Sequence, residues 1–377
     1  MNVQPFSINV SQAVLDDLKR RLAGTRWTPE VEDPNWNYGT NVTYLKKLVD
    51  YWHNQYDWRK HETELNKFPH FRAEIEGIGI HFIHVRGKGP NPTPLLLTHG
   101  WPDSFYRFHK VIPMLTDPAS FGGDPNTSFD VIVPSMPGFG FSDPIALSEE
   151  RIADLWVKLM NGLGYARFAA AGGDVGANVT KALAFKYPEA VTAIHLTEVG
   201  YPTGQEDFST MSPAELEFAG FIQGWWFQQG AYAMIQMTKP QSLALGLHDS
   251  PVGLAAWIMS FMCMTMTGEN IEQRFSRDEL LTNIMIYWVT ETIGSSVRSY
   301  YESAQAQPLM NPGDRVEVPT AVAHYPDDAP LPREWAARHV NLQQFTDMAR
   351  GGHFAAWEVP ELYAADLQKF ISSLRGS

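Results

Sequence analysis

The sequence predicts an α/β fold in which a mostly parallel sheet is flanked by helices and carries an inserted helical lid. Three observations support this prediction. Short apolar runs, each followed by a turn and a helical pattern, recur through the middle of the chain. The strand signal disappears between residues 201 and 311 and then returns. The first 70 residues are helical in pattern and rich in aromatic side chains.

The expected strands cover residues 71–75, 80–85, 95–98, 131–134, 168–171, 191–196, 318–323 and 340–345. The first two alternate between apolar and polar residues, as half-buried strands do. The next four are short apolar runs, which are typical of a parallel sheet covered on both faces. Such sheets place their ligands at the carboxyl ends of the strands.

Helices are expected at residues 11–22 and 44–58 near the N-terminus, at 177–186, at 221–237, 252–266 and 278–302, and at 360–374. The chain therefore divides into an N-terminal helical extension that wraps the core (1–70), an α/β core (71–200 and 312–377) and a helical lid (201–311). A homodimer is compatible with the sequence, which does not determine the oligomeric state.

The composition excludes several classes of protein. Hydrophobic residues make up 44% of the chain and charged residues 19%, which predicts a large packed core rather than disorder. The net charge is −13 and no run of Lys and Arg occurs, which disfavours nucleic acid and anionic membranes as partners.

One stretch is long enough to be considered as a membrane span, because no charge occurs between Asp249 and Glu269. Pro251, Gly253 and several hydroxyl residues interrupt it, so a buried helix is the better interpretation. The N-terminus has neither a basic nor an apolar region typical of a secretion signal. We therefore expect no membrane anchor and a cytoplasmic location.

Residues 172–176 form the pattern G-x-D-x-G between an apolar strand and a helical run. This pattern matches the nucleophile elbow of α/β-hydrolases, with Asp174 where serine usually stands. The glycines are needed because a sharp strand-to-helix turn crowds the neighbours of the nucleophile. The alternative is an ordinary glycine-rich turn in which Asp174 only caps the helix.

The segment His-Gly-Trp-Pro at residues 99–102 directly follows the strand at 95–98. In this fold, the loop after that strand supplies one backbone N–H of the oxyanion hole, and the residue after the nucleophile supplies the other. Those residues are Trp101 and Val175 here. The Trp101–Pro102 bond is a candidate for a cis peptide, because only bonds before proline adopt that form at low cost.

A Gly-Gly-His-Phe segment after the last strand supplies a histidine, His353. The expected chain order is nucleophile, acid, histidine, and His353 is the histidine in the right topological place. A lone histidine is more often structural, but this position favours catalysis. Asp327 and Asp328 follow the strand at 318–323, and from the residues alone either could be the acid.

At this point the chain resembles the microsomal-type epoxide hydrolase family, including its soluble fungal and bacterial members. The resemblance covers nearly the whole chain. The segments that carry it are the helical N-terminal region, residues 99–102, 173–174, 238–240, 249–257 and 287–288, and the closing motif at 351–358. The family usually has an aromatic residue after the nucleophile, and this chain has Val175 instead.

The resemblance implies roles for further residues. It selects Asp328 over Asp327 as the acid, because the family's acid lies two residues after its Tyr/Phe-Pro pair. It also implies that two lid tyrosines donate to the epoxide oxygen, and by position these are Tyr232 and Tyr300. Tyr301 is the alternative to Tyr300, and without the family a lid tyrosine would more often serve in packing.

These residues are suited to opening an epoxide. Asp174 would be ionised at neutral pH without a base, and its attack on carbon would give an ester. His353, oriented by Asp328, would then activate a water that hydrolyses this ester to a vicinal diol. We expect no organic cofactor and no metal, and the aromatic lid predicts an apolar epoxide substrate. The expected substrate contacts are Trp225, Trp226 and Phe227. Detoxification is the expected role.

Two other functions are alternatives to an epoxide hydrolase. A haloalkane dehalogenase also uses an aspartate nucleophile, but it commonly holds halide with an indole N–H beside the nucleophile, which Val175 cannot provide. A non-catalytic protein on the same scaffold is disfavoured by the complete set of Asp174, Asp328, His353 and two tyrosines.

Overall fold

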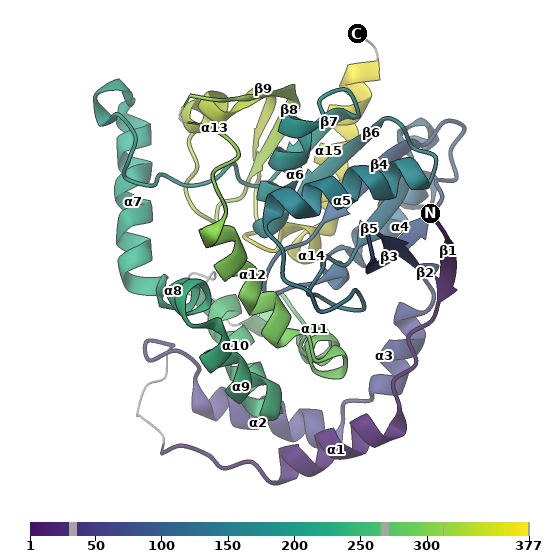
Figure 1. The fold of residues 1–377 in the computed structure, drawn as a ribbon, viewed down its shortest axis with the longest axis vertical. Coiled ribbons are helices and arrows are strands. Elements are labelled where there is room, and N and C mark those ends of the chain that lie inside the picture. The colour runs from purple at the N-terminus through teal and green to yellow at the C-terminus, as the bar shows by residue number, and fades with distance from the viewer. Residues whose placement is uncertain (30–35, 265–270, 312, 376–377) are drawn as a thin grey trace.

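A single large sheet forms the centre of the molecule in the computed structural model, which describes residues 1–29, 36–264, 271–311 and 313–375 (Figure 1). Over these residues the sheet has nine strands in the order β1-β2-β3-β5-β4-β6-β7-β8-β9. The strands are β1 (Val3–Phe6), β2 (His70–Ile75), β3 (Ile78–Val85), β4 (Thr93–Thr98), β5 (Phe129–Pro134), β6 (Phe168–Gly172), β7 (Val191–Leu196), β8 (Val316–His324) and β9 (Val340–Asp347).

The sheet is mostly parallel, as the sequence predicts. The pairs from β5 through β4, β6, β7 and β8 to β9 are parallel, whereas β1, β2 and β3 add antiparallel strands at one side. Every residue of β5 and β6 is buried, which explains their continuous apolar character. The carboxyl ends of β4, β6, β7 and β8 therefore lie side by side at one edge of the sheet.

Helices cover both faces of this sheet. On one face α5 (Glu149–Gly162) packs on α6 (Val175–Lys186), and α6 in turn contacts β4, β6, β7 and β8. On the other face α15 (Pro360–Arg375) contacts α4 (Val111–Thr116), β8 and the short helix α14 (Ala355–Glu358). A further helix, α13 (Arg333–His339), contacts β9. This arrangement confirms the predicted α/β-hydrolase architecture.

The lid follows β7 and consists of helices beyond the carboxyl edge of the sheet (Figure 1). Its helices are α7 (Pro213–Gln229), α8 (Ala231–Thr238), α9 (Pro240–Asp249), α10 (Pro251–Met264), α11 (Arg277–Thr290) and α12 (Ile293–Gln305). Helix α10 is largely buried, in agreement with the expectation for this charge-free stretch. None of the helices in the described residues combines the length and apolarity that a membrane span requires.

Several expected elements differ from the structure. The helix expected at 221–237 is divided at Gly230, a poor helix former that lies between the end of α7 and the start of α8. The helix expected at 278–302 is broken at Glu291, which adopts a left-handed conformation with φ of 57°. The helix expected at 44–58 becomes α2 (Val42–Asn54) and α3 (Trp58–Leu65), where Asp57 caps α3. The end of the helix expected at 252–266 lies outside the described residues.

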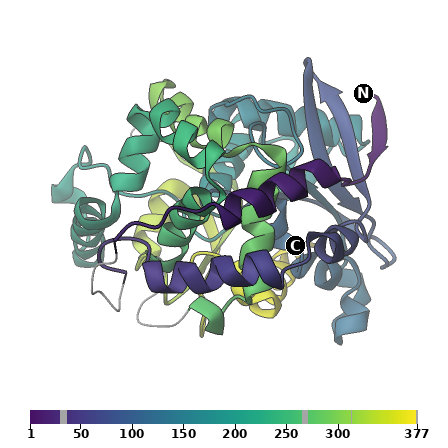
Figure 2. The same cartoon turned by 90° about the horizontal axis from the view of Figure 1, so that it is seen from below.

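The N-terminal residues run across the underside of the lid (Figure 2). Arg21 at the end of α1 (Gln12–Ala23) pairs with Asp249 at 2.8 Å. Tyr51 of α2 donates a hydrogen bond of 2.8 Å to Asp278. Strand β1, which the sequence analysis missed because it is short and exposed, joins the same segment to the sheet. Because residues 1–70 contact both the lid and the sheet, their separation as one unit stays a proposal.

Two buried histidines connect the extension to the sheet. His70 Nε2 lies 2.8 Å from the Leu65 carbonyl, and His70 Nδ1 lies 2.9 Å from His81 Nε2. His81 Nδ1 lies 2.8 Å from Ser135 Oγ. One neutral tautomer of each ring satisfies all three contacts, because each ring then has one donor and one acceptor. Burial lowers the pKa of His70, and burial together with the His70 charge lowers the pKa of His81.

This pair should make the fold sensitive to mild acid. Since the folded state holds both pKa values below that of an unfolded histidine, about 6.5, the stabilisation is complete above that pH and declines as the pH falls below it. The loss approaches about 1.4 kcal/mol per pH unit for each proton that only the unfolded chain binds. We expect His81→Gln to reduce the slope of the free energy of unfolding between pH 7 and 5.5, measured by urea denaturation.

The matched control is His248→Gln, because the side chain of His248 is 50% exposed. This variant should keep the slope of the unaltered chain. Equal slopes for His81→Gln and the unaltered chain would show that the buried pair does not cause the acid sensitivity.

Candidate active site

Asp174 stands at the tip of the turn between β6 and α6, as the sequence predicts. Its φ of 58° and ψ of −137° lie in a region that residues with side chains rarely adopt. The turn is tight because α6 begins against β4, so that a Cβ on Gly176 would lie 2.1 Å from the Thr98 carbonyl oxygen. Glycine is therefore required there, and the strained turn presents Asp174 at the carboxyl edge of the sheet.

The two backbone donors expected for the oxyanion hole converge on one oxygen of Asp174. The N–H groups of Trp101 and Val175 donate to Oδ1 at 2.8 and 2.7 Å. Gly100 allows this approach, because a Cβ there would lie 2.3 Å from the same oxygen. The Trp101–Pro102 peptide is cis. The second oxygen, Oδ2, receives neither of these bonds.

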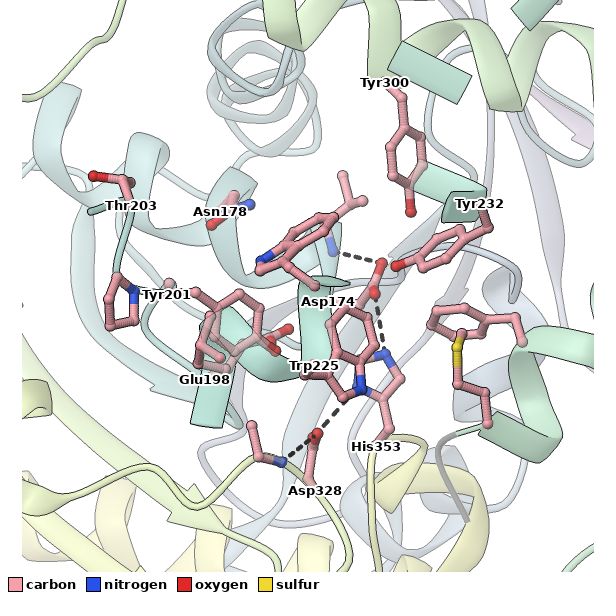
Figure 3. Close-up of a pocket in the computed structure, with 18 of the residues that line it drawn as sticks. Asp174, Asn178, Glu198, Tyr201, Thr203, Trp225, Tyr232, Tyr300, Asp328 and His353 are labelled. Carbon is pink, nitrogen blue, oxygen red and sulfur yellow. Dashed lines mark hydrogen bonds and ion pairs between the residues drawn. The ribbon is translucent and has the colours of Figure 1, made fainter. Parts of the chain in front are cut away.

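His353 lies between two carboxylates (Figure 3). Its Nε2 is 3.0 Å from Asp174 Oδ2, and its Nδ1 is 3.3 Å from Asp328 Oδ2. The structure thus places Asp328 against the imidazole, while Asp327 pairs with Arg274 at 2.7 Å. All three members of the predicted set Asp174, His353 and Asp328 meet at the carboxyl edge of the sheet.

The charges of this set stabilise one another. Burial favours neutral His353, but the charge of Asp328 and the contacts with Asp174 outweigh it and hold the pKa of His353 well above its usual range. Burial also opposes the ionisation of Asp328, whereas the His353 charge and the Ala329 N–H lower the pKa of that carboxyl. These influences favour a protonated His353 beside an ionised Asp328.

The two predicted lid tyrosines face the nucleophile. Tyr232 is on α8 and Tyr300 is on α12, and both hydroxyl groups point toward Asp174 in Figure 3. The indole of Trp101 orients both rings, stacking on Tyr232 at 5.7 Å and meeting Tyr300 edge-on at 5.9 Å. Tyr301 is 41% exposed and does not line the cavity, so the structure places Tyr300 there instead.

A cavity of about 860 Å³ lies between the lid and these residues. Its wall is mostly apolar, and the apolar residues that line it include Phe221, Ile222, Trp225, Trp226, Met237, Phe261 and Met264. The prediction that Phe227 contacts substrate is wrong, because its side chain is 93% exposed and does not line the cavity. Apolar and polar residues are not segregated to separate faces of α7, so the sequence pattern could not distinguish its cavity face from its solvent face.

A buried ion pair that the sequence does not predict supports the site. Arg107 pairs with Asp103, and its Nη2 donates a hydrogen bond of 2.6 Å to the His353 carbonyl oxygen. Asp103 Oδ1 accepts 2.7 Å from the N–H of Gly100. The pair therefore connects the loop that holds Asp174 Oδ1 with the loop that carries His353. No local pattern could have revealed it, because 246 residues separate Arg107 from His353.

The charged side chains at the edge of the cavity do not form a metal site. Over the described ranges, no group of three or more His, Cys, Asp and Glu side chains is arranged to hold an ion.

Two family models match the chain. The model described as "Epoxide hydrolase N terminus" matches residues 3–108, and the model described as "alpha/beta hydrolase fold" matches residues 93–259. Together they cover the extension, the first part of the core and much of the lid.

Known proteins resemble the whole chain. "Epoxide hydrolase 1" of Sus scrofa is 38% identical over 99% of this chain and 89% of its own length. The crystal structure of juvenile hormone epoxide hydrolase from Bombyx mori is similar with a TM-score of 0.88 and 28% identity, covering 100% of this chain and 95% of that one. The Aspergillus niger epoxide hydrolase structure has a TM-score of 0.83 and 28% identity, covering 99% of this chain and 97% of that one. The chain belongs to the epoxide hydrolase family of the α/β-hydrolase fold.

Proposed function

We propose that this epoxide hydrolase works through a covalent ester on Asp174. The observation that carries the proposal is that the two oxygens of that carboxylate have different contacts. Oδ1 is held by the Trp101 and Val175 N–H groups, whereas Oδ2 faces His353 and the cavity. The carboxylate is therefore oriented with Oδ2, the oxygen outside the two backbone hydrogen bonds, as the one that attacks a carbon atom of a bound epoxide.

In the first step, Oδ2 forms a bond to the epoxide carbon and the carbon–oxygen bond of the ring breaks. The departing oxygen needs a proton or a hydrogen-bond donor, and Tyr232 and Tyr300 are positioned to supply it. Burial and the charge of Asp174 raise the pKa of Tyr232, and burial, Tyr232 and Asp174 raise that of Tyr300. Both hydroxyl groups therefore stay protonated and available as donors.

In the second step, His353 takes a proton from water, and the water oxygen attacks the ester carbon of Asp174. The negative charge then develops on Oδ1, where the two N–H groups already lie. Each such donor contributes about 3 kcal/mol to stabilising the transition state. Collapse of this intermediate breaks the bond between the ester carbon and the product oxygen, and His353 returns its proton to that oxygen to release a vicinal diol. The new carboxyl group of Asp174 loses its proton, which replaces the one that a tyrosine gave in the first step, and the carboxylate is restored.

The charges around His353 explain how it can be protonated in the resting enzyme and act as a base in the ester intermediate. In the resting enzyme the carboxylates of Asp174 and Asp328 keep His353 protonated. Formation of the ester removes the negative charge of Asp174, and with it one of the influences that raise the pKa of His353. The imidazole then loses its proton more easily and becomes a base when the ester needs one.

The apolar cavity supports an apolar epoxide as the substrate, with Trp225 and Trp226 among its contacts. A volume of about 860 Å³ exceeds what a small epoxide fills, which favours a large substrate. The mechanism uses only the side chains described here and water. A cytoplasmic location, a role in detoxification and a homodimer stay predictions from the sequence.

The ester intermediate can be trapped and labelled. We expect His353→Gln to consume about one equivalent of an aryl epoxide per enzyme without further diol formation, because the ester forms but no base hydrolyses it. Mass spectrometry should find the added mass on the peptide that contains Asp174. In a single turnover of the unaltered enzyme in ¹⁸O water, the label should appear in that peptide.

The control is Asp174→Ala, which should form neither the adduct nor the diol. Diol formation by Asp174→Ala, or label found only in the diol, would refute the covalent mechanism while leaving the family assignment intact.

The tyrosines should act on the first step. We expect Tyr232→Phe and Tyr300→Phe each to slow formation of the ester about 10- to 100-fold, because each removes one donor to the departing oxygen. The rate can be followed by stopped-flow tryptophan fluorescence, since Trp225 and Trp226 line the cavity. Tyr301→Phe is the matched control and should keep the original rate. If Tyr232→Phe and Tyr300→Phe form the ester as fast as Tyr301→Phe, these two tyrosines do not act as donors to the departing oxygen.

A further inference from the structure

A third carboxyl group lies at the site and has no role in the mechanism described so far. Glu198 follows β7 by two residues, and Asp174 follows β6 by two residues. Gly172 and Leu196 are paired in register, so Glu198 is level with the nucleophile on the neighbouring strand. Its side chain lines the cavity, although Glu198 is only 8% exposed.

The two oxygens of Glu198 differ in their surroundings. Oε2 accepts a hydrogen bond from the hydroxyl group of Tyr201. Oε1 is buried and has no hydrogen-bond partner among the described residues. Figure 3 shows the carboxyl group beside Tyr201, directed into the cavity toward the region of His353 and Asp328. An unpaired oxygen in such a place is costly unless the site uses it.

The charged groups around Glu198 identify its main partner. Burial raises the pKa of Glu198, and the charges of Asp328 and Asp174 raise it further, against the influence of His353 and the Tyr201 hydroxyl. Among these charged groups, His353 has the largest influence. Lys181 donates a hydrogen bond to the carbonyl oxygen of Val199, and burial, opposed by the charge of Glu198, lowers its pKa to about 8. Burial and the two nearby carboxyl groups therefore favour the neutral form of Glu198, whereas His353 favours its ionised form.

We propose that Glu198 is a second acid for His353, a positioning residue that can take over the task of Asp328. The proposal rests on the mechanism above, in which His353 needs a carboxylate to orient its ring and to stabilise its charge. Two carboxyl groups then serve one imidazole, with Asp328 in direct contact with Nδ1 and Glu198 as the second.

The ionisation of Glu198 depends on the charge of Asp328. Burial raises the pKa of Glu198 most, and the charge of Asp328 raises it further, because two carboxylates close together resist ionising at the same time. Loss of the Asp328 charge removes this repulsion, and His353 then favours ionised Glu198. Glu198 releases its proton to water in the cavity and supplies the missing negative charge beside the imidazolium.

A purely structural role is the alternative. Glu198 and Tyr201 could simply fasten the loop after β7, in which case removing the carboxylate would affect the site equally whether or not Asp328 is present. The two roles differ in how the effects of substitutions combine and in the pH dependence of the second step.

The test uses the full-length enzyme with Asp328→Asn, Glu198→Gln and the double variant. The rate of the second step is measured as the decay of the Asp174 ester in single turnovers with an aryl epoxide. We expect Glu198→Gln alone to lower this rate less than threefold. Asp328→Asn should lower it about 10- to 100-fold, and adding Glu198→Gln should lower it at least tenfold further.

The pH profile separates the two roles. The acid limb of the ester decay reports the pKa of His353 in the ester state. We expect its midpoint to lie about one pH unit lower in the double variant than in Asp328→Asn, because ionised Glu198 raises the histidine pKa. The conservative variant Asp328→Asn/Glu198→Asp should restore part of the rate.

Three outcomes decide the matter. Equal decay rates and midpoints for Asp328→Asn and the double variant would overturn the role of Glu198. A tenfold loss from Glu198→Gln in both backgrounds, with unchanged midpoints, would instead establish the structural role. Failure of the unaltered enzyme to form the Asp174 ester would reject the underlying mechanism and is recognised separately by the absence of the mass adduct.

Discussion

The structure depends on the hydrogen bonds that the Trp101 and Val175 N–H groups donate to one oxygen of Asp174. The backbone of a strained turn and the backbone of the loop after β4 must approach each other closely for these bonds to form. That approach is possible only where Gly100 and Gly176 leave the space that a side chain would occupy. In the proposed mechanism, the same contacts that hold Asp174 in the resting enzyme would also receive the charge in the second step, so no reorganisation would be needed between the steps.

A buried ion pair holds the loop that binds Asp174 at a fixed position relative to His353. Asp103 and Arg107 are almost fully buried as an ion pair, and such a pair is costly to break because the partner left behind would be an unpaired buried charge. Asp103 accepts from Gly100, and Arg107 donates to the His353 carbonyl oxygen. The relative position of Asp174 and His353 is therefore fixed by Gly100, Asp103 and Arg107, none of which lines the cavity. An error of 1 Å there would separate the reacting atoms.

The sequence predicts those parts of the molecule whose signals are local. Strands between buried faces, the glycine pattern around Asp174 and the chain order up to His353 all follow from short segments. The choice of Asp328 and Tyr300 over Asp327 and Tyr301 came from family resemblance, because neighbouring identical residues differ only in which way the backbone turns them. Phe227 was misassigned since α7 has no polar face to orient it. Arg107 and Glu198 join the site through contacts between distant segments, which no local pattern records.

The site is divided between the two halves of the fold, and each half contributes groups to the proposed chemistry. Asp174, His353 and Asp328 come from the rigid carboxyl edge of the sheet, whereas both tyrosines come from lid helices α8 and α12. Those two helices pack on α9 and on each other, which fixes the donors relative to the nucleophile. The apolar wall contributed by α7 is different, because α7 makes few contacts with the rest of the fold beyond α8 and α13. Changes along α7 can therefore reshape the cavity without moving a catalytic group, so that substrate range and catalytic geometry can vary independently.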